Sequence, residues 1–228
     1  MFKAGTVIDD YQIMALLGRN TMSSVYLVNH IQRNIKYAME ITYLDFMTDQ
    51  ELSTTKKEIE ILKSLCHPNI ISYVREFTAD KGTTLYLIME YAEGMNLLIM
   101  YLTVLDKDLA LNIQAQAETG EPYTEDQIWN WICQMRYGID FIHSKGLLHC
   151  NLKSQNILLT KSGNIKLSGF GLSALVQQNQ TILSGSGTSL LYTAPEVIRS
   201  EKYTKGAEMW SLGVIIYEMC CLDRKSVV

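Results

Sequence analysis

The segment L-L-H-C-N-L-K-S-Q-N-I-L-L-T-K-S-G-N-I-K-L-S-G-F-G, residues 147–171, decides how the rest of the chain is interpreted. Residues 157–159 and 165–167 are short apolar or alternating runs, and the K-S-G-N sequence between them is typical of a hairpin turn. Polar loops lie at both ends of this predicted hairpin, over residues 149–156 and 168–171. Loops that a rigid hairpin presents are a common place for a catalytic or binding site.

The two loops resemble the catalytic centre of the protein kinase family, H-R-D-L-x-x-x-N followed by D-F-G. On this resemblance His149, Lys153 and Asn156 match the family's histidine, lysine and asparagine. Asn151 stands where the family has its catalytic aspartate, and Gly169 stands where it has a metal-binding aspartate. The resemblance therefore predicts a kinase fold that lacks two carboxylates of the family's reaction.

Composition favours a soluble globular protein. The chain has 228 residues, 47% of them hydrophobic, and a formal net charge of −4, which gives no reason to expect nucleic-acid or anionic-membrane binding. The N-terminus has no apolar signal core, and the longest apolar run, near residues 212–222, is too short to span a bilayer. We expect an intracellular protein, cytoplasmic or cytoskeleton-associated. The five cysteines show no C-x-x-C pairing, so we expect reduced thiols that are mostly packed.

The N-terminal part resembles the small lobe of a kinase. Residues 18–25, G-R-N-T-M-S-S-V, follow a predicted strand and resemble the glycine-rich loop G-x-G-x-x-G-x-V. Gly18 keeps its glycine, whereas Asn20 and Ser23 place side chains where the family lets bare backbone approach phosphates. An ordinary hairpin turn explains this segment as well as nucleotide contact does.

The next strand, residues 36–41, aligns with the family's V-A-I-K, so that Glu40 occupies the position of the phosphate-binding lysine. Taken alone, Glu40 would be a solvated strand residue. A helix predicted over residues 48–65 carries Glu58 at the position of the glutamate that pairs with this lysine. Because two carboxylates repel each other, we expect this helix to be displaced, or Glu58 to turn toward Lys56, Lys57 or solvent.

The resemblance also gives candidate positions for the lining of an ATP site. Met89 is the gatekeeper position, and residues 90–92 form the hinge that follows two predicted strands, residues 71–77 and 84–90. The candidate lining is Leu17, Gly18, Val25, Ala38, Glu40, Met89, Glu90, Ala92 and Leu158. It implies at most weak ATP binding without magnesium.

Two helices are predicted before the central hairpin. The first covers residues 97–117, and the second begins after Thr124, an N-cap residue, and runs to residue 144. Trp129, Trp131 and Phe141 in the second helix are expected in the core, because apolar aromatics at helical spacing are more often core residues than ligand contacts.

After the hairpin, residues 172–192 resemble an activation segment that ends at the family's A-P-E motif, here residues 194–196. Its hydroxyl groups are either phosphorylation sites or part of a mobile polar loop, and they include Thr181, Ser184, Ser186 and Thr188. Cys150 replaces the arginine that would hold such a phosphate. A helix over residues 208–219 resembles the family's central D-x-W-S-L-G helix, with Glu208 in place of the aspartate. This helix is apolar on all faces and must be surrounded.

Three segments are most similar to the NimA-related (NEK) kinases. They are K-S-Q-N-I-L-L at residues 153–159, T-K-S-G-N-I-K-L at residues 160–167 and H-P-N-I at residues 67–70. The predicted fold class is therefore α+β, a bilobal kinase-like fold with a β-rich N-lobe and a mainly helical C-lobe truncated after its central helix. The predicted organisation is an N-terminal extension over residues 1–10, an N-lobe over residues 11–92 and an incomplete C-lobe over residues 93–228.

The predicted function is that of a pseudokinase, an interaction or scaffold module that requires no cofactor. No catalytic residue is expected to work at the family positions Asn151, Lys153 and Asn156, and no metal is expected at Asn156 and Gly169. One alternative is a Ser/Thr kinase of low activity that uses Arg19, Lys153 and Asn156 in other roles. A further alternative is a fragment that folds poorly or only with a partner.

Overall fold

The computed structural model describes residues 2–19, 23–79, 82–92, 108–169, 176–177 and 190–222, without the side chains of residues 54, 58, 176 and 177. The chain divides into two compact units. Residues 1–66 and 71–106 form the first unit, and residues 67–70 and 107–228 form the second. The first is rich in strands and the second in helices, as expected for an α+β kinase fold.

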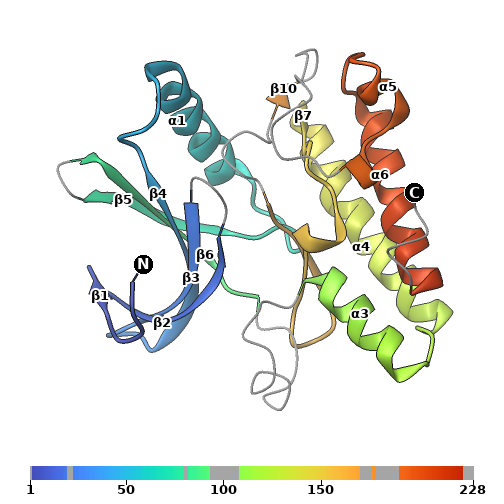
Figure 1. The fold of residues 1–228 in the computed structure, drawn as a ribbon, viewed down its shortest axis with the longest axis horizontal. Coiled ribbons are helices and arrows are strands. Elements are labelled where there is room, and N and C mark those ends of the chain that lie inside the picture. Colours follow the sequence, from blue (N-terminus) through green and yellow to red (C-terminus); the bar gives the residue numbers. More distant parts are fainter. Residues whose placement is uncertain are drawn as a thin grey trace. The chain divides into compact units, whose positions relative to one another are not determined.

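The first unit contains an antiparallel sheet with the strand order β1-β2-β3-β4-β6-β5 (Figure 1). The strands are β1 (Val7–Ile8), β2 (Tyr11–Arg19), β3 (Ser23–His30), β4 (Ile35–Tyr43), β5 (Tyr73–Ala79) and β6 (Thr84–Glu90). The predicted strands are confirmed: β2, β3 and β4 are slightly longer than predicted, β5 begins and ends two residues later than predicted, and β6 has the predicted bounds. The first ten residues join the sheet through β1, which pairs with β2.

One face of this sheet carries the core of the first unit. Tyr26, Met39 and Ile88 lie at neighbouring register positions on β3, β4 and β6, and all three are buried. The sheet curls strongly, as an ion pair between its two sides shows. Arg75 on edge strand β5 lies 2.8 Å from Asp9, which is beside β2 toward the opposite edge. The Arg75 guanidinium also lies 4.9 Å from the centre of the Phe77 ring.

The predicted helix of the first unit is confirmed as α1 (Asp49–Ser64). Thr48 caps it, since the Thr48 hydroxyl accepts a hydrogen bond from the Glu51 backbone while the Glu51 carboxylate accepts one from the Thr48 backbone. Near the C-terminal end, Lys63 pairs with Glu60 at 2.7 Å and with Glu76 of β5 at 2.8 Å. The orientation expected for Glu58 lies outside the described residues.

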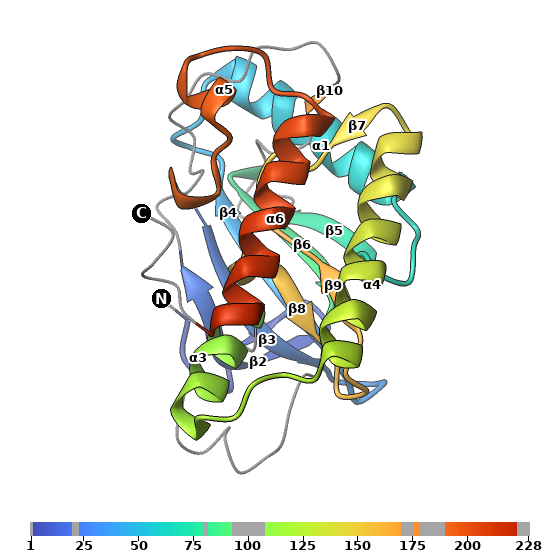
Figure 2. The same cartoon turned by 90° about the vertical axis from the view of Figure 1, so that its right-hand side faces the viewer.

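The second unit contains the helices α3 (Leu109–Thr119), α4 (Glu125–Ser144), α5 (Pro195–Ile198) and α6 (Lys205–Cys221). Helices α4 and α6 pack side by side (Figure 2). The Thr124 cap of α4 is confirmed, because its hydroxyl accepts from the Gln127 backbone. Of the first predicted helix, residues 97–117, the described part is α3, which begins at Leu109 because the Asp108 carboxylate caps it by accepting from the Leu111 backbone. Residues 93–107 lie outside the described residues.

The central hairpin is confirmed as β8 (Ile157–Leu159) and β9 (Ile165–Leu167). Helix α4 holds it, because the Trp131 indole nitrogen donates to the Gly163 carbonyl at 2.9 Å. Asn69 of the H-P-N-I segment holds it as well. Its amide donates to the Gln134 side chain and to the Ile165 carbonyl, and its own carbonyl accepts from the Leu167 backbone at 2.8 Å. The H-P-N-I segment thus anchors strand β9.

Two expectations about burial are wrong, those for Trp129 and for the cysteines. Trp129 is 56% exposed on the outer side of α4, although Trp131 is buried. Of the five cysteines only Cys150 is buried, and all five are free thiols. Helix α6 exposes Met209, Trp210 and Tyr217 on one side within the described residues, so it is not surrounded there. No helix in the described ranges is long and apolar enough to cross a membrane.

Candidate functional site

The two loops identified from the sequence meet in the second unit. Strand β7 (Leu147–Leu148) leads into the first loop, and a 3-10 turn, η2 (Ser154–Asn156), closes it. The Asn156 amide donates to the Asn151 carbonyl at 2.6 Å, and the Asn151 amide donates to the Gly169 carbonyl at 3.1 Å. The backbone and the hydroxyl of Ser168 both donate to the Asn156 carbonyl. The family positions Asn151, Asn156 and Gly169 are therefore in direct contact.

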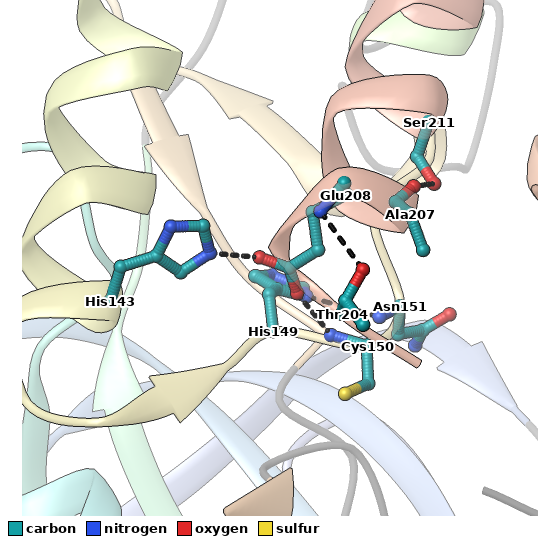
Figure 3. A network of polar contacts seen from close by, with 9 residues as sticks. His143, His149, Cys150, Asn151, Thr204, Ala207, Glu208 and Ser211 are labelled. Atoms are coloured by element: carbon teal, nitrogen blue, oxygen red, sulfur yellow. Dashed lines mark hydrogen bonds and ion pairs between the residues drawn. The ribbon is translucent and has the colours of Figure 1, made fainter. Parts of the chain in front are cut away.

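Glu208 holds the start of this loop (Figure 3). This carboxylate is fully buried on α6, where one oxygen accepts from the Cys150 backbone at 2.8 Å and the other lies 2.6 Å from the His143 imidazole of α4. Cys150 has a φ of +61°, a left-handed conformation that non-glycine residues seldom adopt. The side chain of Glu208, longer than the family's aspartate, thus fixes the strained backbone and joins two helices to the loop.

The buried side chains next to this clamp carry no positive charge for a phosphate. The Cys150 thiol belongs to an apolar cluster, whose other members are Leu148, Ala194, Val197, Tyr203 and Ala207. His149 is also buried, and burial lowers the pKa of its imidazole, which favours the neutral form. The site therefore offers apolar packing where the family has its phosphate-binding arginine. The predicted phosphorylation sites among residues 181–188 lie outside the described part of the chain.

Lys153 and Asn151 do not reproduce the family's pairing of a lysine with a catalytic carboxylate. The Lys153 ammonium makes no hydrogen bond or ion pair with any residue that the structure describes. Asn151 carries an amide, which has no basic lone pair with which to accept a proton from a hydroxyl group. This part of the site offers hydrogen-bond donors and the positive charge of Lys153, but it contains no general base at position 151.

A second buried network joins the loop to the end of the activation-segment region. The Tyr192 hydroxyl donates to the Glu218 carboxylate of α6 at 2.8 Å and lies 2.8 Å from the Ser154 hydroxyl. The Ser211 hydroxyl donates to the Tyr192 carbonyl. These groups fasten η2 and residues 190–192 to helix α6.

The first unit carries the other departures from the kinase motifs. Gly18 pairs with Val25, Val25 with Glu40, and Ala38 with Met89 across neighbouring strands. Because side chains alternate along strands, Val25, Ala38 and Glu40 share the face opposite the core.

On this face, the Ser23 hydroxyl donates to the Glu40 carboxylate at 2.7 Å. Burial raises the pKa of Glu40, and the hydrogen bond from Ser23 opposes this shift. Ser23, which stands where the family has a glycine, is thus hydrogen-bonded to Glu40, which stands where the family has the lysine.

The remaining candidate ATP-lining residues lie in both units. Leu17 precedes Gly18 at an irregularity of β2, Glu90 accepts a hydrogen bond from the Ser72 backbone, and Ala92 follows β6. Leu158 belongs to β8 in the second unit. Arg19 lies at the exposed end of β2. The strand register brings the sheet positions together, and the lining as a whole remains a prediction.

The described residues do not fit a magnesium ion at the family's metal positions. Magnesium prefers carboxylate and phosphate oxygens in octahedral geometry. Gly169 has no side chain that could coordinate a metal, so the side-chain oxygen of Asn156 is left without the carboxylate that the family has at position 169. No group of three or more His, Cys, Asp or Glu that could hold a metal ion occurs within the described ranges.

Comparison with known proteins agrees with this arrangement of strands, hairpin and loops. Residues 11–225 match the family described as protein kinase domain. The chain belongs to the protein kinase family. It is 31% identical to serine/threonine-protein kinase Nek3 of Mus musculus, over 95% of the chain and 39% of that protein.

The kinase chain is also 30% identical to Nek11 of Mus musculus, over 98% of the chain and 34% of that protein. It is 28% identical to Nek1 of Mus musculus, over 95% of the chain and 17% of that protein. The chain thus spans less than two fifths of the length of these relatives. The resemblance to the NEK kinases is confirmed at the level of the kinase domain.

Two groups in the site had not been assigned a role from the sequence. His143 contacts Glu208 from the last turn of α4, and Ser168 links Gly169 to Asn156. Nothing in the sequence around His143 or Ser168 indicates these roles. A signal for the Ser23–Glu40 pair did exist, because a β3–β4 hairpin pairs Val25 with Glu40 and places Ser23 diagonally on the same face.

Proposed function

We propose that this kinase domain is catalytically inactive and acts as an interaction or scaffold module for protein partners inside the cell, in the cytoplasm or on the cytoskeleton. Phosphoryl transfer depends on positioned cations that neutralise developing charge and on a group that accepts the hydroxyl proton. The positions that supply these effects in the family carry Glu40, Asn151 and Gly169. A general base alone contributes about 10²–10⁴ in rate.

The observation that carries the proposal is the way in which the replaced residues bond to one another. Glu40 accepts from Ser23, and Asn151 bonds to both Gly169 and Asn156. These hydrogen bonds hold Glu40, Asn151 and Asn156 in place without a metal ion or a phosphate. ATP binding is therefore expected to be weak and independent of magnesium, and the domain needs no cofactor.

The rival function is phosphotransfer of low activity that uses Arg19, Lys153 and Asn156. The test is transfer of radiolabelled phosphate from ATP to a mixture of protein substrates, with magnesium. The matched control is the Lys153→Ala, Asn156→Ala double variant. The proposal expects the chain and the control to be equally close to background. Labelling by the unaltered chain that clearly exceeds the control would overturn the proposal in favour of the low-activity kinase.

A further inference from the structure

Gly169 packs closely against the side chain of Asn156. Gly169 has a φ of +74°, and its carbonyl accepts from the Asn151 amide at 3.1 Å. A Cβ atom added to Gly169 would lie 2.3 Å from the Asn156 Cγ and 2.4 Å from its two terminal atoms. Real Cβ atoms essentially never approach another heavy atom below 3.0 Å.

Asn156 is not free to give way without loss. Its side-chain nitrogen donates to the Asn151 carbonyl at 2.6 Å, while its main-chain carbonyl accepts both the backbone and the hydroxyl of Ser168 and so fixes the backbone beside it. Moving its side chain would leave the Asn151 carbonyl without this donor. An unsatisfied polar group inside a protein is costly.

We infer that residue 169 has to be a glycine because Asn156 occupies the volume of any side chain there, and that Asn151, Asn156, Ser168 and Gly169 form a lock in place of a metal site. An acid restored at position 169 alone would then collide with Asn156 and would not create a cation site. The inference goes beyond the proposed function, because it holds whether or not the domain transfers phosphate.

The test is a stability cycle on the full chain, measured by thermal denaturation. Gly169→Ala is compared with Gly163→Ala, both in the unaltered chain and in an Asn156→Ala background. Gly163 is a matched control, because its φ is +79° and nothing lies within 4 Å of an added Cβ. Both substitutions therefore carry the same left-handed strain, and only the one at position 169 meets Asn156.

The lock predicts that Gly169→Ala lowers the Tm clearly more than Gly163→Ala does, and that this excess disappears once Asn156 is alanine. Equal losses in the unaltered chain would overturn the inference, as would an excess that persists without the Asn156 amide. If Gly169→Ala fails to fold, recovery of folding by Asn156→Ala supports the lock. If Asn156→Ala with Gly169→Ala stays unfolded while Asn156→Ala with Gly163→Ala folds, the inference is overturned.

A metal titration adds an independent outcome. The Gly169→Asp variant is melted with and without millimolar magnesium, and no change in Tm is expected on adding the ion. A ligand that binds only the folded state must raise the Tm. A magnesium-dependent rise in this variant, with Asn156 intact, would show that acid and amide share a cation and would overturn the lock.

Discussion

At the scale of single residues, Glu40 reverses the charge that the family has at the phosphate-binding position of the first unit. It stands on a sheet face with apolar neighbours, Val25 and Leu87, at its register positions, and its carboxylate accepts a hydrogen bond from the Ser23 hydroxyl. A carboxylate there attracts cations and repels phosphate, the reverse of the lysine that the family has at this position. Burial and charge together make this the position at which a single substitution is most informative.

Glu40→Gln is expected to stabilise the domain at neutral pH by on the order of 1 kcal/mol. The folded carboxyl holds its proton more tightly than the unfolded one, whose pKa has the ordinary value of 4.5. The free energy of unfolding of the unaltered chain therefore falls as the pH rises from 4.5 through the raised pKa of the folded state. Urea denaturation at several pH values should show a gain that grows as the pH rises through the raised pKa of the folded state and shrinks toward pH 4.5.

The control is Glu121→Gln, which changes an exposed carboxyl group and should leave stability and its pH dependence unaltered. A gain from Glu40→Gln that is the same at every pH would contradict the account of burial at Glu40. A loss at neutral pH would contradict it as well.

At the scale of elements, the β8–β9 hairpin depends on helix α4. Trp131→Phe keeps most of the apolar surface but removes the indole donor to the Gly163 carbonyl, which should cost about 1 kcal/mol. Trp129→Phe is the matched control on the same helix, because Trp129 is exposed and bonds to the exposed Glu125, and it should change stability by less than about 0.5 kcal/mol. Urea denaturation of both variants measures the difference. Equal losses would show that the hydrogen bond to Gly163 does not hold the turn.

The elements were predictable wherever the local pattern alone decides them. Alternating residues predicted the strands and the hairpin, apolar spacing predicted helix α1, and Thr124 predicted the start of α4. The Asp108 cap at the start of α3 is not revealed by the apolar spacing that predicts a helix over residues 97–117. Trp129 was assigned to the core because it is apolar, but its position on α4 lies on the outer side, opposite Met135 and Ile139.

At the scale of the whole molecule, Glu208 connects helices α4 and α6 to the loop at residues 149–156. Glu208→Ala should cost about 3 kcal/mol or more, because it leaves the Cys150 backbone donor and the His143 imidazole without their buried partner. Thermal denaturation should show a large fall in Tm. Glu201→Ala, at an exposed position just before α6, is the control and should melt close to the unaltered chain. A Glu208→Ala variant that melts like this control would refute the clamp.

The site could be predicted only in part. The order and spacing of the motifs predicted which residues stand at the catalytic positions, and the structure brings Asn151, Asn156 and Gly169 together. The sequence could not show that Asn156 fills the space beside Gly169, or that Cys150 adopts a left-handed backbone. These features depend on how segments far apart in the chain pack, which no local pattern encodes.

The most direct test of the central claim, that this domain has lost its means of holding a magnesium-bound triphosphate, is the Tm of the purified chain titrated with ATP, with and without magnesium. Any ligand that binds only the folded state raises the Tm, by an amount that increases with its affinity and concentration. The account predicts at most a small rise with ATP, and the same rise when magnesium is added. A large rise that requires magnesium would contradict it.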